Sequence, residues 1–207
     1  MKTTLLAAAA VIALMTPAYA ADKANTAAPA PVAPVTYQFD PAHTSATWEV
    51  DHLGFSKVSG KFPNITGSVT LDSQTPANSS VTAEIDTLAL VTGTTGFDDH
   101  LKSNDFFKTK QFNKATFKST KVEVTGENTA KVEGMLNIIG IEKPLTLDVT
   151  LNKKGVNPFS KKEQVGFSAT GVVNRNDYGL TYGRPNVPDE VTLNIQAEAA
   201  IADAAAE

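Results

Sequence analysis

Apolar and polar residues alternate with a period of two through most of the chain between residues 37 and 200. This pattern is typical of half-buried β-strands, because successive side chains of a strand point to opposite faces of the sheet. A change of face between Ser119 and Val122 predicts a β-bulge near Thr120. We expect about eight antiparallel strands, with residues 37–39 leading into the first of the runs 46–50, 65–71, 81–85, 115–124, 132–138, 145–151, 165–173 and 191–197.

The alternation stops in segment 97–117, which holds half of the ten phenylalanines of the chain. Phe97 and Leu101 lie at a helical spacing, and acidic residues fall in the first turn, where a helix dipole favours them. We predict a short helix inserted into a sheet protein. An insert this rich in apolar groups would plug one end of a barrel or line a cavity within it.

A β-sandwich would produce the same alternation as a barrel. Two features favour the barrel: the phenylalanine-rich insert, and glycines at the core-facing positions Gly67, Gly134 and Gly171. Glycine at such a position allows a sheet to curve or a neighbouring group to pack closely. The predicted fold class is all-β, an antiparallel barrel with a short helical insert.

The first twenty residues have the composition of a secretory signal peptide. Lys2 supplies a positive charge, a short apolar run follows, and Ala18 and Ala20 are small residues of the kind a signal peptidase recognises. We expect cleavage after Ala20 and a soluble, exported protein located in the periplasm. Residues 21–36 are predicted to be an alanine- and proline-rich linker, residues 37–200 one domain, and residues 201–207 a flexible tail.

The net charge narrows the class of partner, and the lack of cysteine narrows the source of stability. The formal net charge is −4, and an acidic chain without a basic cluster argues against nucleic acid or an anionic membrane surface as the main partner. Four lysines flank one loop, which we expect them to solvate: Lys153, Lys154, Lys161 and Lys162. With no cysteine, stability has to come from the core rather than from disulfides.

Few residues are candidates for catalysis or metal binding. The three histidines, His43, His52 and His100, match no common zinc spacing, and no Gly-x-Ser-x-Gly nucleophile motif occurs. We expect His43 and His52 to form hydrogen bonds near Asp40 and Asp51 at strand ends. We therefore predict neither an enzyme nor a metal or cofactor site.

Several short motifs, in a fixed order, resemble the YceI family of exported polyisoprenoid-binding proteins. The resemblance spans about residues 37–199 and rests on Asp40, His43, Thr44, Trp48, Val50, His52, Gly54, Gly60 and Phe62, then His100 to Lys102 and Asp105 to Phe107, then Thr116 and Phe117, then Gly134, Leu136, Ile138, Gly140, Lys143 and Pro144, then Asn174, Arg175, Asp177 to Gly179, Asp189 and Val191. It implies an eight-stranded, lipocalin-like barrel whose apolar pore encloses an isoprenoid or another long amphiphilic lipid.

We predict ligand contacts for large apolar residues on the inward face and for two residues after the strand that ends near Asn174. Arg175 and Tyr178 would contact a head group at the rim, although Arg175 fixing its own turn is the stronger expectation. Trp48 would either form part of the pocket wall or fill the core. The full predicted set is Trp48, Val50, Phe55, Phe62, Ile85, Leu101, Phe106, Phe107, Phe117, Leu136, Ile138, Phe167, Arg175 and Tyr178.

The functional expectation is a carrier or store for a polyisoprenoid lipid, such as an isoprenoid quinone. Two alternatives remain open at this stage: a fatty-acid or fatty-amide binder, and an interaction module whose barrel is filled by its own side chains. The sequence also leaves open the identity of the lipid, transient contact with a membrane or membrane protein as donor, a homodimer, and contact of the histidines with a head group.

Overall fold

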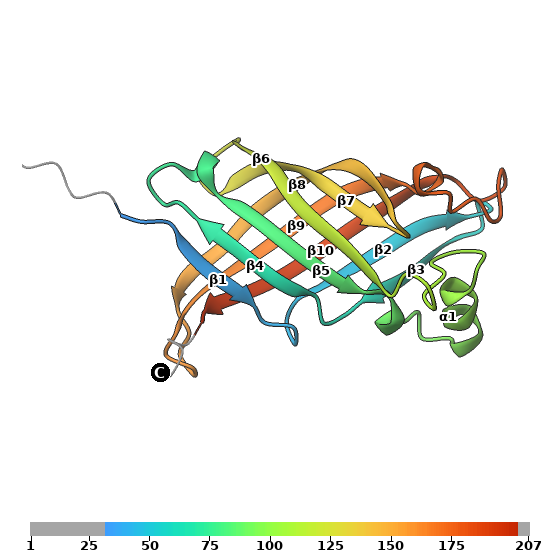
Figure 1. The fold of residues 1–207 in the computed structure, drawn as a ribbon, viewed down its shortest axis with the longest axis horizontal. Coiled ribbons are helices and arrows are strands. Elements are labelled where there is room, and N and C mark those ends of the chain that lie inside the picture. Colours follow the sequence, from blue (N-terminus) through green and yellow to red (C-terminus); the bar gives the residue numbers. More distant parts are fainter. Residues whose placement is uncertain (1–31, 203–207) are drawn as a thin grey trace, which may run out of the picture. The chain divides into compact units, whose positions relative to one another are not determined.

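The computed structural model describes residues 32–202, all of which fall within one compact unit. The predicted signal peptide and most of the predicted linker lie outside these residues. One antiparallel sheet of ten strands closes on itself through pairing of its first and last strands in sequence (Figure 1). The strands are β1 (Val35–Phe39), β2 (Ser45–His52), β3 (Ser56–Phe62), β4 (Thr66–Leu71), β5 (Ser80–Asp86), β6 (Lys114–Val124), β7 (Thr129–Ile138), β8 (Ile141–Val156), β9 (Glu163–Asn174) and β10 (Glu190–Ile201).

The ten strands form eight staves, where a stave is one full-length position in the barrel wall, because two of the staves each consist of two shorter strands. β1 and β2 lie end to end along one edge of β10, where Phe39 pairs with Ala199 and Ser45 with Gln196. β3 and β4 continue one another in the same way, β3 paired with β2 and β4 with β1. Short breaks at residues 40–44 and 63–65 divide the two staves. The structure confirms the predicted eight-stranded antiparallel barrel with one short helix.

The strand Ser56–Phe62 was missing from the sequence prediction, which passed directly from the first run to 65–71. Val58, Gly60 and Phe62 do alternate there, but lysines, serines and glycine weaken the apolar signal. The outer boundaries also differ slightly, since β1 begins at Val35, inside the predicted linker, and β10 ends at Ile201.

Bulges and close glycine contacts shape the wall. The predicted bulge near Thr120 is confirmed by a register shift between Ser119 and Lys121 against β7. A Cβ atom on Gly134 would lie 2.6 Å from the carbonyl oxygen of Lys118 and closer still to the ring of Phe117. Glycine there allows this ring to lie against the neighbouring strand.

The predicted helix is present as α1 (Thr95–Lys102), in the connection between β5 and β6 that also holds the 3₁₀ turn η2 (Thr87–Ala89). Asp98 in its first turn accepts hydrogen bonds from the backbone nitrogen and the Oγ1 of Thr92, each at 2.6 Å. Leu101, 5% exposed, is the buried residue of α1 and packs with Trp48 and Leu90.

In an antiparallel barrel, successive connections fall at alternate ends. We call the end that carries α1 the helix end; it holds residues 53–55, 87–113, 139–140 and 175–189 (Figure 1). The opposite end, the hairpin end, holds residues 72–79, 125–128 and 157–162 and includes the 3₁₀ turn η1 (Pro76–Asn78). Within residues 32–202, no helix has both the length and the apolar character to cross a membrane.

Arg175, at the start of the 3₁₀ turn η3 (Arg175–Tyr178), organises the connection between β9 and β10. Its guanidinium donates to four backbone carbonyls, those of Leu180, Tyr182, Val187 and Pro188, at 2.7–2.9 Å. Burial lowers the pKa of this guanidinium, although an arginine remains protonated under ordinary conditions. The side chain of Arg175 thus fixes the turn by donating to carbonyl oxygens. The carboxylate of Asp189 is further away, with its Oδ1 4.0 Å from Nη2 of Arg175.

Replacement of Gly134 by alanine tests the close packing of the wall. We expect Gly134→Ala to lower the free energy of unfolding by about 1–3 kcal/mol, because the new methyl group overlaps Phe117 and a backbone carbonyl. Denaturant titration measures the loss. Gly166→Ala is the control, since its Cβ would have no atom within 4 Å. Equal stability of the two variants would contradict this account.

Replacement of Arg175 by methionine tests its hold on the β9–β10 connection. We expect a loss of about 2–4 kcal/mol in the free energy of unfolding, because partly buried carbonyls lose their charged donor. Arg184→Met, on the same connection but exposed, should cost less than about 1 kcal/mol in the same thermal or chemical denaturation. A small effect at residue 175 would show that the connection holds without this side chain.

Candidate functional site

A cavity of about 870 Å³ occupies the interior of the barrel. Its volume is within the roughly 300–1,000 Å³ range of ligand pockets. All ten strands contribute side chains to it, and those in the middle of the barrel are apolar: Val69, Val81, Ala83, Ala115, Phe117, Val132, Leu136, Leu145, Leu147, Phe167, Ala169, Leu193 and Ile195. The interior therefore resembles a hydrocarbon solvent rather than a polar binding site.

Twelve of the fourteen residues predicted to contact a ligand line this cavity. They come from six strands, from the segment that contains α1, and from the turn after β9: Trp48, Val50, Phe62, Ile85, Leu101, Phe106, Phe107, Phe117, Leu136, Ile138, Phe167 and Arg175. The structure brings these residues together around one space, and their contact with a ligand stays a prediction.

Phe55 does not belong to this set. It lies in the turn between β2 and β3 and is 89% exposed. The alternation that aims Trp48 and Val50 inward ends with β2 at His52, so the apolar character of Phe55 no longer indicates an inward direction. Its assignment to the cavity was wrong.

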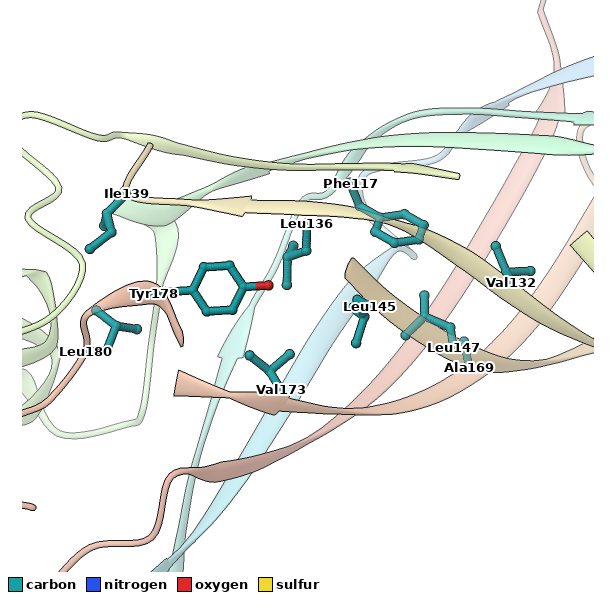
Figure 2. Packing of buried hydrophobic residues seen from close by; sticks show 10 residues of the cluster. All are labelled: Phe117, Val132, Leu136, Ile139, Leu145, Leu147, Ala169, Val173, Tyr178 and Leu180. Carbon is teal, nitrogen blue, oxygen red and sulfur yellow. The ribbon is translucent and has the colours of Figure 1, made fainter. Parts of the chain in front are cut away.

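Tyr178 is buried but lies outside the cavity lining. It belongs to the main core cluster, and Figure 2 shows its hydroxyl end pointing toward Leu136. Burial, with a smaller effect of Asp177, raises the pKa of this phenol to about 12. The residue acts in the packing of the helix end, next to Leu180 and Val173, rather than as a rim contact (Figure 2).

Aromatic contacts join the segment 97–107 to the barrel wall. Phe97 packs edge-on against Trp48 with ring centroids 6.4 Å apart, and Phe107 packs against Phe62 at 5.4 Å. All four rings line the cavity. The insert therefore does both things that the sequence suggested: it covers the helix end, and it forms part of the cavity surface.

A second group of rings joins the insert to the β9–β10 connection. His100 lies 4.7 Å from the ring centroid of Tyr182 and 5.1 Å from that of Phe106, and these two rings are 5.4 Å apart. Nε2 of His100 is 3.0 Å from Oδ2 of Asp105. The three rings line the cavity at the helix end and connect two segments that are distant in sequence.

The other two histidines differ from each other. Nδ1 of His43 is 2.6 Å from Oδ2 of Asp40, as expected, and this hydrogen bond raises the pKa of the imidazole. His52 lines the cavity, whereas Asp51, on the opposite face of β2, accepts from the backbone nitrogen of Gly54 at 2.7 Å. Because neighbouring strand residues point to opposite faces, the side chain of His52 points away from Asp51, and this acid is not the partner in the hydrogen bond expected for His52 at the strand end.

Polar groups gather at the hairpin end of the cavity, where Lys154 is part of the lining together with Asp72 and Glu127. Tyr37, fully buried, donates from its hydroxyl to Glu163, and Nζ of Lys154 lies 3.4 Å from the same carboxylate. Burial raises the pKa of Tyr37, and its hydrogen bond lowers the pKa of Glu163. Among residues 32–202, no three potential ligands converge on a metal position.

Several lining residues were absent from the predicted set. Leu145, Leu147, Leu193 and Ile195 are in phase with the alternation of β8 and β10, so the same pattern that selected Trp48 would have found them. Tyr182 is different: it lies in an irregular connection, and no sequence period indicated its direction.

Sequence comparison relates the chain to bacterial proteins. The model of the YceI-like domain matches residues 37–199. A UPF0312 protein of Pseudomonas putida (strain W619) is 38% identical over 138 residues, which cover 67% of this chain and 71% of that protein.

Solved structures agree with this relationship. The YCEI protein of Campylobacter jejuni is 28% identical and superposes with a TM-score of 0.64 over 74% of this chain and 90% of its own. A polyisoprenoid binding domain from Saccharophagus degradans, implicated in plant cell wall breakdown, shares the fold at 12% identity, with a TM-score of 0.62 over 80% of this chain and 98% of that one. Because the family model spans nearly the whole barrel, the chain belongs to the YceI-like domain family.

Proposed function

We propose that the barrel binds a polyisoprenoid or isoprenoid-quinone lipid and acts as its soluble carrier or store in the periplasm. The observation that carries the proposal is the continuous apolar cavity inside the barrel. The predicted signal peptide at residues 1–20 supports the periplasmic location. The neighbour from Saccharophagus degradans supports the choice of ligand, since it is described as polyisoprenoid-binding and has the same fold.

The energetics favour a long apolar chain. Burial of a methylene group is worth about 0.8 kcal/mol, so one five-carbon isoprenoid unit contributes roughly 3–4 kcal/mol before costs. Immobilisation of the ligand costs about 4–15 kcal/mol, and micromolar affinity requires a net gain of roughly 8 kcal/mol. A few units in an apolar interior are sufficient, without many polar contacts.

The family and the fold point to a binding protein rather than an enzyme. The two histidine–carboxylate pairs, His43 with Asp40 and His100 with Asp105, have no nucleophile hydrogen-bonded to the imidazole within residues 32–202. In covalent catalysis, a general base activates a nucleophile that lies within hydrogen-bonding distance of it. We therefore propose a role in binding, with the chemistry of the lipid left to other proteins.

Extraction of the protein purified from its native host tests the proposal. We expect mass spectrometry to show an isoprenoid lipid at close to one per chain, and isoprenoid quinone to quench the fluorescence of Trp48 in a titration, because the indole lines the cavity. A fatty acid or fatty amide in the extract would overturn the choice of lipid. A ligand-free protein that does not respond to quinone would overturn the function.

Truncation of the insert tests whether it selects the ligand. We expect the triple variant Leu101→Ala, Phe106→Ala, Phe107→Ala to co-purify with a different distribution of lipid lengths, because these side chains form the wall at the helix end. Circular dichroism establishes that the variant is folded. Val172→Ala, exposed on the outside of β9, is the control and should leave the distribution unchanged. Unchanged lipid in the folded triple variant would show that the insert only covers the barrel.

A further inference from the structure

The turn between β8 and β9 exposes apolar side chains to an unusual degree. We call residues 156–162 the tip. Phe159 is 92% exposed and Val156 63% exposed, and they are separated by only two residues. Scattered apolar residues on a surface are normal, but an almost fully exposed phenylalanine on a projecting turn is costly to hydrate.

The tip holds Phe159 in this position through local hydrogen bonds. Oδ1 of Asn157 accepts from the backbone nitrogens of Phe159 at 2.8 Å and Ser160 at 3.1 Å, and the backbone nitrogen of Lys161 donates to the carbonyl oxygen of Asn157 at 3.0 Å. Side-chain bonds of this kind fix a turn. Phe159 is therefore presented outward by an ordered turn.

The surroundings of Phe159 are basic, unlike the chain as a whole. Residues 153–163 contain four lysines and one glutamate, whereas the formal net charge of the protein is −4. Lys153 and Lys161 are exposed, and Lys154 is paired with Glu163. Charges further than about 8 Å from a surface are largely screened at physiological ionic strength. An approaching surface therefore meets the local positive charge, and the overall acidity has little effect there.

Exposed aromatic and aliphatic side chains flanked by lysines match the boundary between lipid head groups and acyl chains. The apolar groups enter the boundary, while the lysine ammonium groups remain with the phosphates. A protein partner fits less well, because lysine is depleted in protein interfaces. We propose that the tip is a docking site for an anionic phospholipid surface.

Docking at the tip would orient the cavity relative to the lipid surface. Lys154 lies on the same hairpin and lines the cavity, so the hairpin end faces the lipid surface when Phe159 is inserted. This consequence rests on the proposed lipid-binding function, whereas the docking itself does not. Lysines at the tip would then face the lipid surface and not only solvate their loop.

Co-sedimentation of the purified protein with vesicles tests the docking site. We expect binding to phosphatidylcholine vesicles that contain phosphatidylglycerol, weak binding to phosphatidylcholine alone, and loss of binding at high salt. Phe159→Ser should lower the partition coefficient about tenfold, because burial of a phenylalanine is a large part of insertion. The double variant Lys153→Glu, Lys161→Glu should lower the partition coefficient by about tenfold or more, because each lysine is attracted to an anionic surface.

The chain supplies a matched control. Phe55→Ser removes an equally exposed phenylalanine from a turn at the helix end and should leave vesicle binding unchanged. The proposal would be overturned by absence of vesicle binding, by equal effects of the two phenylalanine variants, or by a Phe159 variant that loses a protein partner while it keeps vesicle binding. Lipid content, measured separately by extraction, distinguishes failure of docking from failure of ligand binding.

Discussion

Closure of the sheet along β10 is the constraint on which the rest of the structure depends. β10 pairs with β9 from Glu190 to Ala200, which is nearly its whole length, and its other edge pairs with β2 near its start and with β1 near its end. Each stave then has a neighbour on both sides, except along β3, which pairs with β2 on one side and has a single bridge on the other. Closure also fixes how much interior space the staves enclose. Small residues such as Ala83, Ala115 and Ala169 face this space, so the side chains leave a cavity.

The insert between β5 and β6 follows from an imperfection of this closure. β4 pairs with β5 toward the hairpin end, but β3 continues past β5 toward the helix end and meets the β5–β6 connection only through a bridge between Lys61 and Val91. The gap in the wall must be covered by apolar groups if the interior is to remain dry. Leu90, Leu101 and Phe107 supply that cover, which explains why phenylalanine is concentrated in a segment that is not a strand.

The sequence predicted the parts of the structure that local periodicity controls. Alternation identified most strands and the inward direction of Trp48, because side-chain direction in a strand depends on position alone. It did not identify the strand Ser56–Phe62, whose inward positions include Gly60, a glycine that leaves room for the indole of Trp48. The position of such a strand is determined by its pairing with the neighbouring strand β2 rather than by its own apolar pattern. Phe55 and Tyr178 were misplaced for a related reason: in a turn, direction depends on hydrogen bonds that no sequence period reveals.

The two ends of the cavity differ in a way that bears on the entry of a ligand. At the helix end, the rings of His100, Phe106 and Tyr182 pack together, and Arg175 ties down the connection that carries Tyr182. Opening there would break aromatic contacts and expose carbonyls that have a charged donor. At the hairpin end, the lining consists of turns with polar side chains, and Nζ of Lys154 reaches Oγ of Ser73 at 3.4 Å across the rim. Separation of such exposed polar contacts costs little, since water replaces them. The hairpin end is therefore the easier route into the barrel, and it is the end that carries Phe159.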